Sequence, residues 1–143
     1  ERYAEQVKWQ IGSAYPLPVE KTYEVRGRNL ITGLPESIEI SSVEVREALS
    51  HSISIIIATI KDALDEVPPE IVADLMDIGI CLTGGGALLQ GLPERLTDEL
   101  RLRVWAAEAP LTCVCRGTGM VLDDLENLSR FLVGLERGST RHS

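Results

Sequence analysis

Apolar residues recur at helical spacing through a long central segment of the chain. The series is Leu49, Ile53, Ile56, Ile57, Ile60, Leu64 and Val67. Steps of three and four positions put such residues on one helix face. Ser41 and Glu44 form a capping-box pattern at its start, and Pro68 marks its end, because a residue before proline leaves the α region. We therefore expect one helix of roughly 24 residues here, although Ile53 to Ile57 alone would also suit a strand.

Shorter patterned segments lie on both sides of this helix. We expect further helices over residues 2–11, 69–78, 92–100 and 110–125, and strands over 22–28, 37–40, 80–82 and 103–106. The predicted order is α-β-β-α-α-β-α-β-α, which indicates an α/β fold. Residues 1–41 form a small helix-and-hairpin part, and residues 42–135 form an alternating α/β part. The polar residues 136–143 are expected to be a disordered tail.

Composition narrows the class of protein. The chain has 143 residues, of which 44% are hydrophobic and 25% charged, typical of a globular domain. Its net charge is −8 and only 4% of residues are aromatic, so binding to nucleic acid is not expected. No signal-peptide pattern is present, and the apolar stretch 53–60 is far too short to span a bilayer. We expect a cytoplasmic protein and, because the chain begins with Glu1, a piece of a longer one.

Cysteine and histidine are scarce. Cys81, Cys113 and Cys115 are expected to be free thiols that act as small buried hydrophobic residues in a reducing cytosol. The two histidines, His51 and His142, are too few and too far apart in the sequence to suggest a zinc site. We therefore expect no metal site built from these residues.

The segment with most chemical information is Thr83-Gly84-Gly85-Gly86. It follows the short apolar run 80–82, expected to be a buried strand, and precedes a helical turn expected at 87–89. Glycines allow a positive φ and let a ligand approach the backbone closely. The pattern suits either a nucleotide or phosphate loop, or a tight turn with close strand–helix packing. It matches neither the P-loop nor the dinucleotide-binding pattern, and the chain has no nucleophile elbow.

Several motifs resemble one known family. The segment from Leu82 to Leu89 is similar to the adenosine motif of the actin-like ATPases. Other segments are similar to the MreB/Mbl family of bacterial actin-like proteins: Ile11-Gly12-Ser13-Ala14-Tyr15-Pro16, Glu24-Val25-Arg26-Gly27-Arg28-Asn29-Leu30, Thr32-Gly33-Leu34-Pro35, Pro68-Pro69-Glu70, Glu108-Ala109-Pro110-Leu111-Thr112 and Gly117-Thr118-Gly119. The resemblance covers about residues 1–125.

The resemblance implies a partial actin-like ATPase (ribonuclease H-like) fold, namely most of lobe two. Residues 1–41 are then the small outer subdomain, and residues from 42 onward are part of the nucleotide-side subdomain. Proteins of this family bind ATP between two lobes and polymerise into membrane-associated filaments that guide cell-wall synthesis. The implied partners are further copies of the protein, the wall-synthesis machinery and the inner membrane, the last through a lobe that this chain does not contain. Residues 13–33 are then expected near a filament end, with Glu24, Arg26 and Arg28 on a polar face.

The resemblance also implies a nucleotide site. The residues expected to line the adenosine are Thr83, Gly84, Gly85, Gly86 and Ala87. Glu5-Gln6-Val7-Lys8 matches the family's helix whose Glu and Lys contact adenine and ribose. Spacing alone instead favours a surface ion pair between Glu5 and Lys8. The implied cofactor is ATP, with Mg²⁺ in the full-length protein. The family's phosphate loops and their aspartates are not in this chain, so we name no catalytic or metal residue and expect the chain alone not to hydrolyse ATP.

Two other classes of function stay open. One is another ATPase of the actin superfamily, such as a sugar kinase or a chaperone, against which the segments 13–16 and 24–40 argue. The other is an interaction module that binds no nucleotide. Gly117 and Gly119 lie within a helical pattern, where we expect them to allow close packing, and a role in ligand binding is the alternative.

Overall fold

The computed structural model describes residues 2–128, which form two compact units divided between Leu111 and Thr112. The first unit contains α1 (Arg2–Ile11), β1 (Thr22–Arg28), β2 (Pro35–Ser41), α2 (Ser42–Asp65), α3 (Pro69–Ile78), β3 (Ile80–Leu82), the 3₁₀ helix η1 (Gly85–Leu88), α4 (Leu92–Leu100) and β4 (Val104–Ala106). The second contains α5 (Cys113–Asp123) and α6 (Leu125–Leu128). The boundary expected near residue 41 falls within the first unit and stays a proposal, and the expected tail 136–143 lies outside the described residues.

The helix α2 confirms the prediction made from its sequence. Ser41 is the N-cap, and its hydroxyl accepts a hydrogen bond from the Glu44 amide at 3.3 Å. The Glu44 carboxylate in turn accepts from the Ser41 amide at 2.8 Å, which completes the capping box. Ile53 and Ile57 of α2 are buried in the core. Local signals therefore fix where this helix begins and which face it buries.

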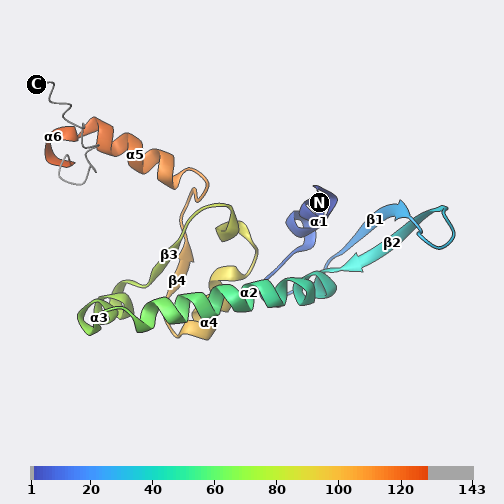
Figure 1. The fold of residues 1–143 in the computed structure, drawn as a ribbon, viewed down its shortest axis with the longest axis horizontal. Coiled ribbons are helices and arrows are strands. Elements are labelled where there is room, and N and C mark those ends of the chain that lie inside the picture. Colours follow the sequence, from blue (N-terminus) through green and yellow to red (C-terminus); the bar gives the residue numbers. More distant parts are fainter. Residues whose placement is uncertain (1, 129–143) are drawn as a thin grey trace, which may run out of the picture. The chain divides into compact units, whose positions relative to one another are not determined.

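The strands β1 and β2 form an antiparallel hairpin at the N-terminal end of α2 (Figure 1). Pairing runs from Thr22 opposite Ser41 to Arg28 opposite Pro35, so β2 is longer than the predicted 37–40. The Asn29 side chain shapes the connecting turn by accepting hydrogen bonds from the amides of Ile31 and Thr32. This is the Asx-turn chemistry that lets a short loop hold one conformation.

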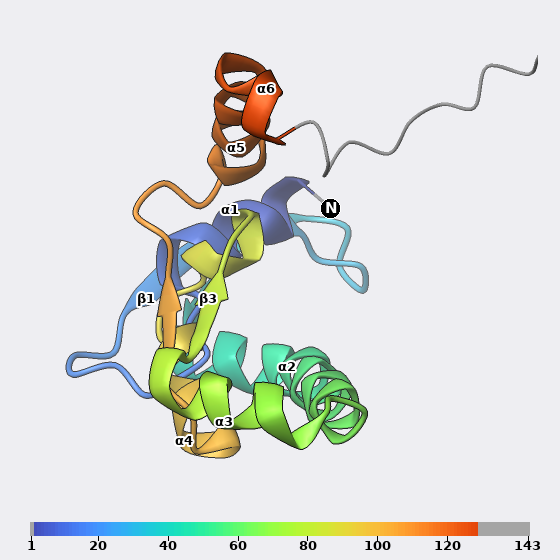
Figure 2. The same ribbon diagram turned by 90° about the vertical axis from the view of Figure 1, so that its left-hand side faces the viewer.

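The strands β3 and β4 pair in parallel and lie side by side (Figure 2). The connection between them contains the glycine segment and α4, which makes a β-α-β unit. The core consists of one cluster of buried residues: Ala14, Ile53, Ile57, Leu92, Leu96 and Val104. It joins α2, α4 and β4 to the segment that follows α1, and Leu96 is only 1% exposed.

The burial predicted for the cysteines and for β3 is wrong. Cys81 and Cys115 are exposed and Cys113 is intermediate. In β3, Ile80 and Leu82 are half-buried, and Cys81 points the other way. Among the described residues this sheet has two strands, and Cys81 is exposed on the face opposite Ile80 and Leu82, which pack against the core. The helix α5 buries none of its residues and begins at Cys113, after an N-cap at Thr112, rather than at residue 110.

Within the part of the chain that the structure describes, none of the helices is both long enough and apolar enough to cross a membrane.

Candidate functional site

The helix α1 carries the first group of predicted site residues. Val7 is buried, whereas Glu5 and Gln6 are exposed and Lys8 is half-exposed. The Lys8 ammonium lies 2.8 Å from the Glu5 carboxylate, so the ion pair expected from their spacing is present. The hydrogen bond from Lys8 also lowers the pKa of Glu5. Glu5 and Lys8 are thus charged and solvent-accessible, while the Val7 side chain packs inward and offers a ligand only its backbone.

An open hollow of about 400 Å³ lies along the same helix. It is lined by Arg2, Glu5, Gln6 and Trp9. Positions two, five, six and nine share one helix face, because they are three or four residues apart. Glu5 and Gln6 are predicted site residues, whereas Trp9, which is 75% exposed, was not predicted to line the site. Trp9 lies four residues after Glu5, and this spacing places it on the same helix face.

The glycine segment follows β3 directly and has a defined backbone. Gly84 has φ 79° and ψ −179°, a conformation open to glycine almost alone. Its amide donates to the Pro110 carbonyl at 2.8 Å, and its carbonyl accepts from the Ala87 amide. The helical turn expected at 87–89 is instead a four-residue 3₁₀ helix, Gly85–Leu88, which begins within the glycines. The conformation of Gly84 closes this turn early and gives it the tighter 3₁₀ geometry.

The surface of the glycine segment is open. A Cβ atom added to Gly84 or Gly86 would have no neighbour within 4 Å, and one on Gly85 would lie 3.6 Å from Leu111, an ordinary contact. Thr83, Gly85 and Gly86 are exposed, whereas the Ala87 side chain is buried. The chain's own packing therefore does not require glycine at positions 85 and 86. This weakens the alternative of close strand–helix packing and leaves backbone available to a ligand.

Backbone pairing connects the two predicted site segments. Ser13 bridges Gln90 in parallel, and the Ala14 amide donates to the Gln90 carbonyl at 2.7 Å. Ser13 lies two residues after α1, and Gln90 lies two residues after η1. No local pattern predicts this pairing, because it joins residues far apart in the chain. It anchors the end of the Glu5–Lys8 helix to the end of the glycine segment.

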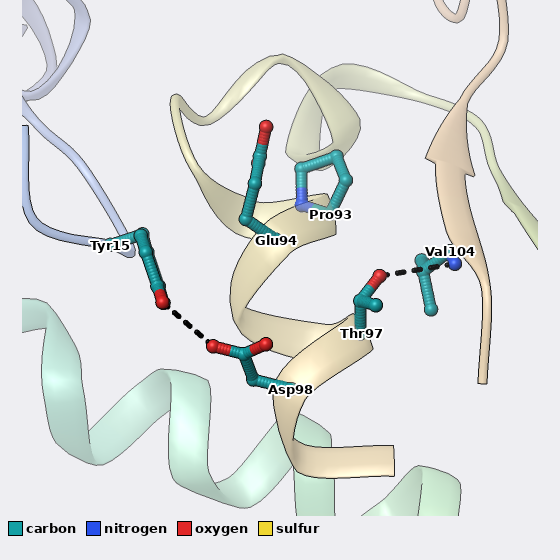
Figure 3. Close-up of a pocket in the computed structure, with 6 residues that line it drawn as sticks. All are labelled: Tyr15, Pro93, Glu94, Thr97, Asp98 and Val104. Carbon is teal, nitrogen blue, oxygen red and sulfur yellow. Dashed lines mark hydrogen bonds between the residues drawn. The ribbon is translucent and has the colours of Figure 1, made fainter. Parts of the chain in front are cut away.

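A second open hollow, of about 300 Å³, lies beside α4 (Figure 3). The Tyr15 hydroxyl donates to the Asp98 carboxylate at 2.7 Å, and Thr97 accepts from the Val104 amide at 3.2 Å. The bond to Asp98 raises the pKa of Tyr15. These polar groups are thus paired with one another, and the hollow shows no arrangement that points to a ligand. Within residues 2–128, no three His, Cys, Asp or Glu side chains are grouped to hold a metal ion.

Comparison with known proteins finds one family. The family model described as "MreB/Mbl protein" matches residues 1–130. Cell shape-determining protein Mbl of Bacillus subtilis is 42% identical over 130 residues, which are 91% of this chain and 39% of that protein. Cell shape-determining protein MreB of Escherichia coli is 44% identical over 126 residues, 88% of this chain and 36% of that protein. The chain therefore spans about two-fifths of the length of these relatives.

Two solved structures have the same fold over most of the chain. MreB5 of Spiroplasma citri bound to ADP superposes with a TM-score of 0.85 at 32% identity, covering 90% of this chain and 39% of that one. The same protein bound to AMPPNP gives a TM-score of 0.84 at 33% identity, with 92% and 40% covered. The architecture is thus a partial actin-like α/β fold.

Proposed function

Because the chain belongs to the MreB/Mbl protein family, we propose that it supplies the adenosine side of an ATP site in a cell shape-determining protein. One observation carries the proposal: in the run Gly84-Gly85-Gly86 after β3, a Cβ on Gly84 or Gly86 would meet nothing within 4 Å, and one on Gly85 would make only an ordinary contact with Leu111. The similar MreB5 structures are bound to ADP and to AMPPNP, which supports a nucleotide as the ligand.

Each segment has a role suited to its chemistry. The backbone from Thr83 to Ala87 receives the adenosine, because a ligand can approach glycines closely. Lys8 donates to a ribose or base acceptor, and the Glu5 carboxylate accepts from a ribose hydroxyl or a base amine. The ion pair between them, at 2.8 Å, holds both head groups on the exposed side of α1 before the ligand binds.

Bound ATP supplies a triphosphate whose terminal group can be transferred to water. Among the described residues no three His, Cys, Asp or Glu side chains are grouped to hold a metal ion. The role that we propose for this chain is nucleotide binding, and we name no residue for the hydrolytic step.

The test is a titration of the full-length protein, as its gene encodes it, with ADP and with a non-hydrolysable ATP analogue. Lys8→Ala is expected to weaken binding about tenfold, equivalent to about 1.4 kcal/mol. Lys21→Ala is the matched control, because it removes an exposed lysine outside the site. Equal affinity in both variants would reduce the Glu5–Lys8 pair to a surface ion pair. Failure of the unmodified protein to bind nucleotide would favour the interaction-module alternative.

We further propose that the protein self-associates into filaments through the tip of the β1–β2 hairpin. Leu30 is 97% exposed and Ile31 is 96% exposed, yet Asn29 holds the turn that carries them in one conformation. An ordered apolar tip is stabilised when another molecule covers it. A further copy of the protein is the occupant that family membership suggests.

Sedimentation of the full-length protein with ATP tests this surface. Leu30→Ser combined with Ile31→Ser is expected to leave most protein in the supernatant. Val19→Ser is the control, since Val19 is 76% exposed but lies outside the hairpin. Normal pelleting of the double variant would show that the hairpin tip is not part of the filament contact.

We also propose, for the full-length protein, a cytoplasmic location, contact with the inner membrane and interaction with the cell-wall synthesis machinery. Names of the relatives support the link to cell shape. Fractionation of cells that express the tagged full-length protein tests the location, and recovery only in the culture medium would contradict it.

A further inference from the structure

We propose that Arg46, on α2, is a positioning residue for the nucleotide site. It holds the segment after α1 in the place where that segment pairs with the end of the glycine segment. The proposal rests on the nucleotide-binding function proposed above.

Arg46 is the centre of a polar network between three segments. One guanidinium nitrogen donates to the Ser13 hydroxyl at 2.9 Å and to the Tyr15 carbonyl at 3.2 Å. The other pairs with the Glu20 carboxylate at 2.6 Å. The Arg46 side chain is only 18% exposed. The planar guanidinium suits this task, because its fixed N–H groups can address several acceptors at once.

A second serine completes the network from the other side. The Ser42 hydroxyl donates to Glu20 and accepts from the Lys21 amide at 2.9 Å. Ser13 and Ser42 are both 0% exposed, the only buried polar residues among those the structure describes. Buried hydroxyls need such partners, so their places depend on one another. The first turns of α2 therefore fix residues 13–21.

The segment held by Arg46 is the segment that joins the two halves of the proposed site. Ser13 and Ala14 pair with Gln90, two residues after η1. Gly91 has no room for a side chain, because its Cβ would lie 2.6 Å from the Tyr15 Cβ. Residues 13–15, which Arg46 holds, are therefore in close backbone contact with residues 90–91, so a shift of one segment moves the other.

These contacts also give each residue of the segment Ser13-Ala14-Tyr15 a structural role, although none of the three is among the predicted nucleotide-binding residues. Ser13 binds Arg46, Ala14 is buried in the core, and the Tyr15 hydroxyl reaches Asp98 (Figure 3). Ala14 belongs to the core cluster and does not depend on a hydrogen bond to Arg46, so we expect the core to stay packed when Arg46 is lost. What is lost is the fixed position of α1 relative to the glycine segment.

The experiment measures ADP affinity of the full-length protein by calorimetry and its melting temperature without ligand. Arg46→Ala is expected to weaken ADP binding about tenfold, within the usual range of coupling between sites. Arg46→Lys restores part of the affinity, because lysine keeps the charge but cannot reach all three acceptors. Arg26→Ala is the control: it removes an exposed arginine paired with Glu24 and leaves ADP affinity unchanged.

A double-mutant cycle distinguishes positioning from a general loss of stability. If Arg46 acts by placing Lys8, then Arg46→Ala costs less affinity in a Lys8→Ala background than in the wild type. Additive losses would overturn the proposal. The proposal would also be overturned if Arg46→Ala left the ADP affinity unchanged while Lys8→Ala still weakened binding. That result would leave the proposed nucleotide-binding function standing. Unchanged affinity in both variants would overturn the proposal and reduce the Glu5–Lys8 pair to a surface ion pair, whereas a wild-type protein that binds no ADP would contradict the proposed function.

Ser13→Ala keeps the test decisive if Arg46→Ala does not fold. It removes one acceptor of Arg46 and leaves the ion pair with Glu20 intact. A smaller loss of ADP affinity, again non-additive with Lys8→Ala, is the expected result. Wild-type affinity in a folded Ser13→Ala protein would overturn the proposal.

Discussion

Two substitutions in the glycine segment separate its structural role from its binding role. Gly84 has φ 79° and ψ −179°, so an alanine there is strained even though its Cβ would meet no neighbour. We expect Gly84→Ala to lower the free energy of unfolding by about 1–3 kcal/mol. Gly85 has no positive φ, and its Cβ would lie 3.6 Å from Leu111. We expect Gly85→Val to change the free energy of unfolding by no more than about 0.5 kcal/mol.

Nucleotide binding is expected to show a different pattern. A valine side chain at position 85 adds bulk to the exposed backbone that the proposed adenosine needs, so Gly85→Val weakens ADP binding at least tenfold, about 1.4 kcal/mol. Urea unfolding followed by circular dichroism gives the stability, and calorimetric titration of the full-length protein gives the affinity. Normal affinity with normal stability in Gly85→Val would refute the reasoning about the ligand. Wild-type stability in Gly84→Ala would refute the reasoning about the backbone.

Four further predictions concern other parts of the chain. The isolated chain shows no Mg²⁺-dependent phosphate release above background, and turnover that co-purifies with it through several columns would contradict this. Reversal of Arg26 and Arg28 to Glu in the full-length protein abolishes pelleting with ATP but preserves nucleotide affinity; normal filaments would exclude this face from the contact. Leu96 is only 1% exposed, so Leu96→Ala is expected to lower the free energy of unfolding by about 2–5 kcal/mol in urea titration. A smaller loss would contradict a tightly packed core at this position. Hydrogen bonds from the Ser41 amide and hydroxyl lower the pKa of Glu44, so the stabilisation by its carboxylate is present above the unfolded-state pKa and is lost as the pH falls through the lower folded-state pKa. Glu44→Gln is expected to remove this loss of stability at acidic pH, and an unchanged pH profile would contradict this.

Elements with a local signal were predictable from the sequence. The cap at Ser41 and Glu44, the apolar series through Ile57 and the following Pro68 define α2 without any distant contact. The same holds for α1, β1 and α3, whose expected limits agree with the structure. In these segments, local hydrogen bonds and the periodicity of the apolar residues decide the outcome.

Features that depend on distant residues were not predictable in this way. The pairing of Ala14 with Gln90 joins segments far apart in the chain, and Arg46 reaches Ser13 across 33 positions. The exposure of Cys81 depends on what packs over its face of the sheet, which the apolar run 80–82 does not reveal. The glycines predicted that this segment could adopt a positive φ. The free space around the segment became visible only from the positions of neighbouring residues in the structure.

The central claim, that this chain receives the adenosine of a bound nucleotide, is tested most directly by photolabelling the full-length protein with 8-azidoadenosine triphosphate. The label reacts at the base, so it marks the residues that lie against the adenine. Tryptic digestion separates residues 3–8 from residues 62–95, which contain the glycine segment. We predict that the label falls on one or both of these peptides and that excess ATP suppresses it. Label that ATP suppresses but that lies only on other peptides would contradict the account.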